Sequence, residues 1–129
     1  MNVISPHNYE GCVREYIFTD GKNQHSVTGI IIPTSPKTFS LLDTDGNMYE
    51  ISNSAVCSGN IIINEVGLIS RDKMVSAHSY LYPLYENARE YVDIVNQIRQ
   101  LERKKIQIVG ERFNLYAERG VNNAISDVS

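Results

Sequence analysis

The sequence has little of what marks secreted and membrane proteins. It contains no tryptophan, only four prolines and only two cysteines, Cys12 and Cys57, which lie far apart. Its apolar runs are short, such as residues 61–63, and none approaches the roughly 20 residues that a bilayer-spanning helix needs. The N-terminal residues are polar and do not resemble a secretory leader. We therefore expect a cytoplasmic protein with free thiols and no membrane contact.

Motifs of common catalytic and cofactor sites are also missing. The sequence contains no Gly-x-Ser-x-Gly elbow, no glycine-rich phosphate loop and no dinucleotide-binding pattern. The cysteines and His7, His25 and His78 lack the close spacing that makes a zinc site recognisable. The sequence thus predicts no catalytic residue, no metal, no cofactor and no small-molecule ligand. An enzyme of unrecognised type, with a cleft between a β domain and a helix, stays an alternative.

The charge balance argues against electrostatic binding of nucleic acid by the whole chain. The formal net charge is −3, and residues 1–60 carry only Arg14, Lys22 and Lys37 as cations. Any affinity for phosphate must therefore come from the second half.

Short strand patterns fill the first half. They are expected at residues 11–19, 25–33, 38–43, 47–51 and 60–68. Turn signals separate them at roughly the 8–12-residue spacing of small all-β folds. The sequence predicts an α+β protein in which residues 1–70 form a small antiparallel β-barrel or sandwich.

The register of one hairpin can be predicted. A three-residue loop at residues 44–46, with Gly46 in the left-handed region, pairs Leu41 with Tyr49 and Phe39 with Ile51. This register places four apolar side chains on one face, whereas a one-residue slip would expose them. Residues 38–56, TFSLLDTDGNMYEISNSAV, resemble the bent central strands of SH3-like and Sm-like small barrels. That resemblance implies binding of peptides or nucleic acid.

A long helix is expected to follow. Residues 84–118 contain no proline and a single glycine, Gly110. Asn87 and Glu90 resemble an N-capping pair. We expect a connector at residues 71–86, an amphipathic helical arm at 87–119 and a flexible tail at 120–129. A kink at Gly110 is an alternative to a continuous helix.

The predicted helix has one apolar face. At 100° per residue, this face contains Tyr91, Ile94, Val95, Ile98, Leu101, Ile108, Val109, Phe113 and Tyr116. Glu102, Lys105 and Arg112 interrupt the face. Such charges would be costly in a buried seam but could set the register of a self-associating helix. Snorkelling of these side chains at the edge of a seam is the other explanation.

We expect this face to bind a protein partner or a second copy of the chain. The predicted interaction residues are Tyr80, Tyr82, Tyr85, Tyr91, Ile94, Val95, Ile98 and Leu101. Tyrosine is common at interfaces, although these rings could instead cap the β domain. The leading interpretation is a non-enzymatic adaptor or regulator that binds a protein partner or forms a homo-oligomer.

Nucleic-acid binding is the alternative from another class. It would use the cations of the helix, Arg99, Arg103, Lys104 and Arg112. Because the cations surround the helix and Glu102 lies among them, an ordinary solvated helix surface explains them as well.

Overall fold

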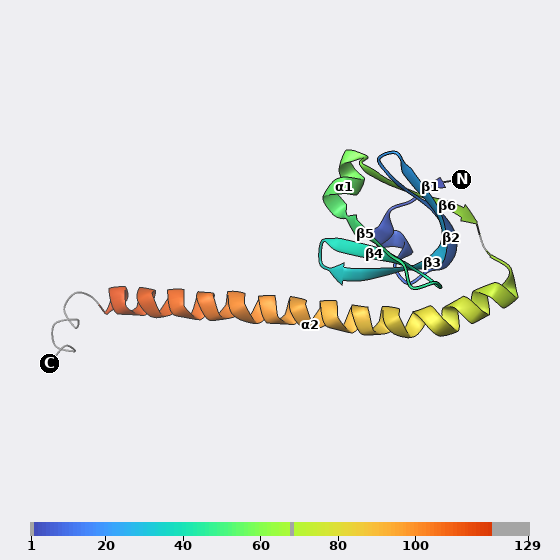
Figure 1. The fold of residues 1–129 in the computed structure, drawn as a ribbon. Coiled ribbons are helices and arrows are strands. Elements are labelled where there is room, and N and C mark those ends of the chain that lie inside the picture. Colours follow the sequence, from blue (N-terminus) through green and yellow to red (C-terminus); the bar gives the residue numbers. More distant parts are fainter. Residues whose placement is uncertain (1, 68, 120–129) are drawn as a thin grey trace. The chain divides into compact units, whose positions relative to one another are not determined.

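The computed structural model describes residues 2–67 and 69–119 and has the predicted α+β class. The chain divides into two compact units, Met1–Asp93 and Ile94–Ser129. In chain order the elements are β1 (Asn2–Val3), η1 (Pro6–Tyr9), β2 (Val13–Asp20), β3 (Asn23–Ser35), β4 (Thr38–Asp43), β5 (Met48–Ser52), α1 (Asn53–Ser58), β6 (Ile61–Gly67) and α2 (Arg71–Glu118) (Figure 1). The five predicted strands correspond to β2 through β6 with small shifts at their ends.

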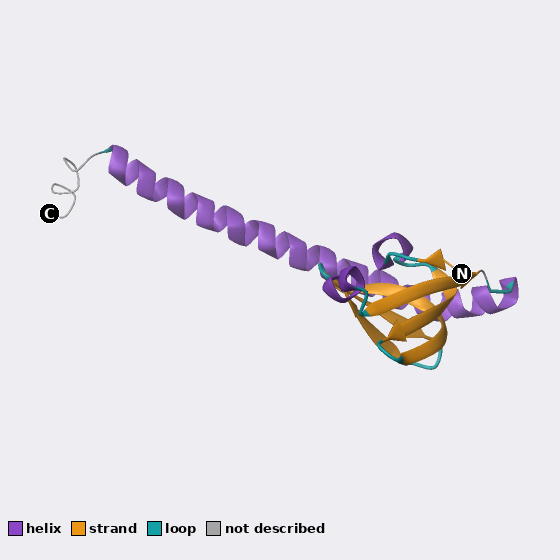
Figure 2. Cartoon of the chain, turned by 90° about the horizontal axis from the view of Figure 1, so that it is seen from above, coloured by secondary structure: helices purple, strands orange, loops and turns teal. Residues whose placement is uncertain are grey.

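The sheet is open and not the predicted closed barrel. Its six antiparallel strands follow the order β1-β6-β2-β3-β4-β5, so β1 and β5 are its edges. Figure 2 shows that the sheet is strongly curved. The reason for the open edge lies after β5, where Ser52 Oγ accepts a hydrogen bond from Ala55 N at 3.2 Å and starts α1. Gly59, at φ 81°, ends α1 and leads the chain into β6, which pairs with β2 instead of β5.

The predicted hairpin register is confirmed. Leu41 pairs with Tyr49, Phe39 pairs with Ile51, and Gly46 has a φ of 88°. The Asp43 carboxylate organises the loop, because its Oδ1 accepts hydrogen bonds from the backbone N–H groups of Asp45 and Asn47. All four apolar side chains of the pairs face the same core.

Alternation along the strands divides the apolar side chains between two cores. The inner core lies on one face of the sheet and contains Ile4, Tyr16, Phe18, Val27, Ile31, Phe39, Leu41, Ile51 and Ile63. Tyr9 of η1 and Val56 of α1 pack against it. The outer core contains Val13, Ile30, Ile32 and Leu42 from the strands, together with Ala77 and Leu81 from α2.

The helix begins much earlier than predicted. It starts at Arg71, so residues 71–86, predicted as a connector, are helical. Pro83 lies inside α2, although a proline in a helix interior costs about 3 kcal/mol. Burial of Leu81 alone contributes roughly 1.5–3 kcal/mol, and Tyr82, Tyr85 and Ala88 also pack against the outer core. Tertiary packing therefore offsets the local cost.

One ion pair and one steric contact hold this part of α2 against residues 10 and 11 of the same unit. Arg89 Nη1 donates a hydrogen bond to Glu10 Oε1 at 2.9 Å, and the carboxylate of Glu10 raises the pKa of Arg89. The ring of Tyr85 lies against Gly11, where an added Cβ would be 2.9 Å from Tyr85 Cζ. Gly11 has a φ of 78°, so both its conformation and its neighbour favour glycine.

The second unit is described as far as residue 119. There α2 continues as a single helix to Glu118, and the alternative of a kink at Gly110 is not confirmed. The predicted tail at residues 120–129 lies outside the described residues. None of the helices in the described residues combines the length and apolarity that a bilayer span requires.

Candidate functional site

The helix of the second unit carries large apolar side chains that its own unit leaves exposed. Leu101 is 65% exposed, Ile98 is 49% exposed and Ile108 is 48% exposed. Every residue from 97 to 119 is exposed. A surface helix normally buries such a stripe, so this exposed stripe is a candidate interaction site.

These side chains follow a heptad repeat, written a to g. Position d is apolar in every repeat and is occupied by Ile94, Leu101, Ile108 and Leu115. Position a is occupied by Ile98, Lys105 and Arg112, and position e adds Val95, Val109 and Tyr116. We call the a, d and e positions of residues 94–116 the heptad face. Apolar residues at d that repeat every seven positions are typical of helices that pair with another helix.

Three charged side chains lie on the heptad face, as expected. Lys105 and Arg112 are at a, and Glu102 is at e. All three are exposed in the helix of the second unit. Their long stems can cover apolar neighbours while their charged ends stay in water. Any helix that packs on this face would therefore have to accommodate Lys105 and Arg112. This requirement restricts the charge of such a helix and whether it can run parallel or antiparallel.

The predicted tyrosine cluster divides into two groups. Tyr82 and Tyr85 pack against the outer core, and Tyr82 stacks on His78 with a ring-centroid distance of 4.4 Å. Burial raises the pKa of Tyr85. Tyr80 and Tyr91, by contrast, are 59% and 60% exposed. The alternative that the rings cover the β domain thus applies to Tyr82 and Tyr85, while Tyr80 and Tyr91 remain available for a partner.

The helix cations do not form a stripe. Arg99 and Arg103 lie about 40° apart around the helix axis, Lys104 lies about 100° further, and Arg112 belongs to the heptad face. All four are exposed. Binding along a nucleic-acid backbone would favour cations on one side, so the nucleic-acid role stays a prediction with no added support.

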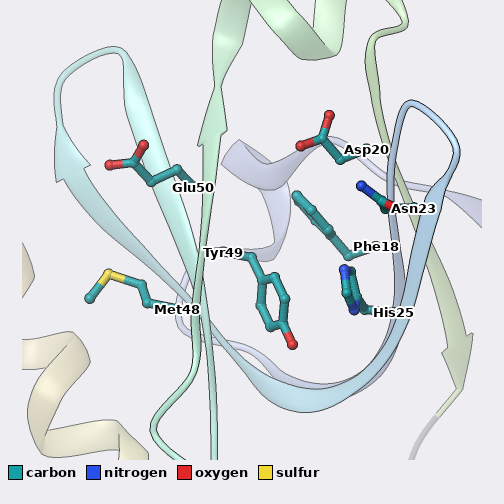
Figure 3. A pocket seen from close by; sticks show the side chains of 7 residues that line it. All are labelled: Phe18, Asp20, Asn23, His25, Met48, Tyr49 and Glu50. Atoms are coloured by element: carbon teal, nitrogen blue, oxygen red, sulfur yellow. The ribbon is translucent and has the colours of Figure 1, made fainter.

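The sheet itself has an open hollow of about 540 Å³ that the sequence did not reveal. Figure 3 shows its lining, which comes from β2, β3 and β5: Phe18, Asp20, Asn23, His25, Met48, Tyr49 and Glu50. The rings of His25 and Tyr49 lie 5.1 Å apart, and those of Phe18 and Tyr49 lie 5.3 Å apart. The predicted hairpin register shows on which face of the sheet Tyr49 lies. It does not show that Phe18 and His25 lie next to Tyr49, because that depends on the β2–β3 pairing of Phe18 with His25.

The chemistry of this hollow suits a cation more than an anion. Asp20 and Glu50 line the hollow together with the rings of Phe18 and Tyr49, and aromatic faces attract positive charge. In the described part of the chain, no three His, Cys, Asp or Glu side chains gather so that they could hold a metal ion. Ligand sites usually enclose most of their ligand, whereas this hollow is open to solvent. The heptad face is therefore the stronger candidate.

Comparisons of the chain with protein-family models, with curated proteins and with solved structures find no match.

Proposed function

We propose that this protein is a non-enzymatic adaptor or regulator that binds another helix through its heptad face. One observation carries the proposal. The two cores of the first unit consist of residues between Ile4 and Ala88, which come mainly from the strands, η1, α1 and the first part of α2. In the second unit, the apolar heptads of residues 94–116 lie on a single helix, and none of these residues is buried. Helix-to-helix docking uses anchors with this spacing.

The exposed tyrosines extend the proposed surface. Tyr91 lies one heptad before Ile98, at position a, and is 60% exposed. Tyrosine combines apolar area with a polar tip, which suits the rim of an interface. Tyr91 is thus the N-terminal end of the proposed contact, while Tyr82 and Tyr85 hold α2 on the sheet.

A pair of matched variants of the whole chain tests the proposal. Leu101→Glu with Ile108→Glu places two charges at d, and Gln100→Glu with Asn114→Glu places the same charges at the outward c positions. Burying a charge without a partner is strongly unfavourable, so the d variant should lose its partner or its second copy. The c variant should behave as the wild type.

Two measurements read the outcome. Sedimentation over a range of concentrations reports self-association, and quantitative affinity purification from cells compares what the wild type and each variant retain. Helix content by circular dichroism should be similar for both variants. If the d variant and the c variant associate equally with every partner and with themselves, the heptad face is not an interaction surface.

A further inference from the structure

We infer that the heptad face pairs with the same face of a second copy, and that the two helices run antiparallel. This inference rests on the proposed function and names its partner and orientation. It follows from where the charges lie on residues 98–116. The d positions supply attraction in any orientation, whereas the charged positions distinguish one orientation and one register from the others.

A parallel pair in register is unfavourable. Position a faces position a in such a pair, so Lys105 would face Lys105 and Arg112 would face Arg112 of the second copy. The flanking g and e positions offer no compensation. They would pair Gln97 with Glu102, Lys104 with Val109 and Glu111 with Tyr116. A parallel dimer therefore contains two like-charge contacts in its seam and no opposite-charge g–e pair on its flanks.

An antiparallel pair relieves these conflicts because position a then faces position d, and like cations no longer share one layer of the seam. In one register Ile98 faces Leu115, and the two-fold axis passes between residues 106 and 107. Each cationic a residue then faces an apolar residue: Lys105 faces Ile108, and Arg112 faces Leu101. The aliphatic stems of the cations can pack on these side chains while their charged ends reach the flank.

The flanks of this register carry complementary charges. Lys104 lies beside Glu111 of the second copy, and symmetry repeats the pair. Arg112 lies beside Glu102 of the second copy in the same way. A shift of one heptad in one direction brings Lys104 beside Lys104, and a shift in the other brings Glu111 beside Glu111. Only the register centred between 106 and 107 pairs opposite charges on both flanks.

This self-complementarity points to a second copy of the chain as the occupant. A two-fold interface requires one surface to match itself, with each residue contacting the residue related by the axis. The heptad face meets that requirement with its own Lys104, Glu111, Glu102 and Arg112. A different partner would have to present opposite charges to these four side chains from an unrelated sequence.

Spin labels at three equivalent positions test the orientation in the full chain. Gln100, Gln107 and Asn114 are exposed, uncharged and all at heptad position c. Each is changed to cysteine in a background with Cys12→Ser and Cys57→Ser, because both natural cysteines are free thiols. Sedimentation first checks that the background assembles like the wild type, with twice the chain mass of 14.6 kDa.

The antiparallel pair predicts a distinctive distance pattern. Labels at position 107 lie near the two-fold axis, so their distance is the shortest. Labels at positions 100 and 114 are each displaced by roughly 20 Å along the axis from their mates, given the 1.5 Å rise per residue. A parallel pair gives the same distance at all three positions. Three equal distances would overturn the inference and leave the proposed function standing.

A charge exchange tests the register independently. Lys104→Glu creates two Glu–Glu contacts per dimer and should weaken self-association by roughly threefold to thirtyfold at low salt. Adding Glu111→Lys should restore the wild-type affinity. If the double variant stays as weak as Lys104→Glu, the proposed register is wrong. A chain that stays monomeric at every concentration would overturn self-pairing, and the Leu101→Glu and Ile108→Glu comparison would then decide whether another partner is bound.

Discussion

Leu81→Ala measures how firmly the first part of α2 is held on the sheet. Leu81 is fully buried, and its neighbours in the outer core include Val13, Ile30 and Ile32 from two paired strands. Leu-to-Ala substitutions in cores cost about 2–5 kcal/mol, and the cost is highest where the surroundings cannot collapse into the cavity. Strands fixed by a hydrogen-bonded ladder cannot move far. We therefore expect a loss of about 3–5 kcal/mol in the free energy of unfolding.

Urea unfolding followed by near-ultraviolet circular dichroism of the tyrosines is a suitable assay, since the chain has eight tyrosines and no tryptophan. The control is Leu84→Ala, because Leu84 lies in the same helix but is 44% exposed. It should cost less than about 1 kcal/mol. For a unit of this size, the expected loss for Leu81→Ala lowers the melting temperature by roughly 12 °C or more. Equal losses for the two variants would refute the docking of residues 71–88.

Two further substitutions test the sheet. Gly29→Ala should lower the free energy of unfolding by more than about 3 kcal/mol in thermal unfolding, because the added Cβ would lie 2.1 Å from the backbone oxygen of Leu42. Gly110→Ala is the control: it has open space around it and should be neutral or slightly stabilising. An unchanged melting temperature for Gly29→Ala would contradict the β3–β4 pairing. Tyr16→Phe removes a hydrogen bond to the Cys12 carbonyl and should cost about 1 kcal/mol at pH 7. Burial raises the pKa of Tyr16, so the unfolded chain loses this proton first and wild-type stability falls as the pH rises above about 10. Urea unfolding of Tyr16→Phe should show a smaller alkaline decline; identical declines would contradict the burial of the hydroxyl.

Local patterns predicted the strands well because each carries its own evidence. The β4–β5 register followed from one glycine and four apolar side chains, and the pairing of Leu41 with Tyr49 confirms it. The closed barrel was wrong, although a local signal against it was present. Ser52 and Gly59 start and end a short helix between β5 and β6, and this cap-to-cap spacing was the signal that could have revealed it.

The start of α2 was missed because local propensity and tertiary packing disagree at Pro83. Ser70 precedes the helix, and its carbonyl accepts a hydrogen bond from Met74 N. Serine is a preferred residue just before a helix, so a start signal was present in the sequence. This signal is convincing only once it is known that Ala77 and Leu81 pack against the sheet. Sequence alone could not supply that contact.

The candidate site also has a part that the sequence pattern predicts and a part that depends on tertiary packing. The exposed anchors Ile94, Ile98 and Leu101 are where the pattern placed them, on one side of a continuous helix. Tyr82 and Tyr85 could not be separated from Tyr80 and Tyr91 by sequence, because their roles depend on which side of α2 meets the sheet. The hollow lined by Phe18, His25 and Tyr49 depends on three strands coming together, which no local signal predicts.

The heptad spacing of the second unit has a consequence for how this chain can change in length. Each residue turns the helix by about 100°, so inserting or deleting a single residue after Asp93 rotates all later anchors away from the earlier ones. A change of seven residues keeps Ile94, Leu101, Ile108 and Leu115 nearly aligned. Insertions and deletions of seven residues between Asp93 and Glu118 should therefore preserve the heptad face better than those of other lengths, and the residues of both cores, Ile4 to Ala88, precede the altered segment.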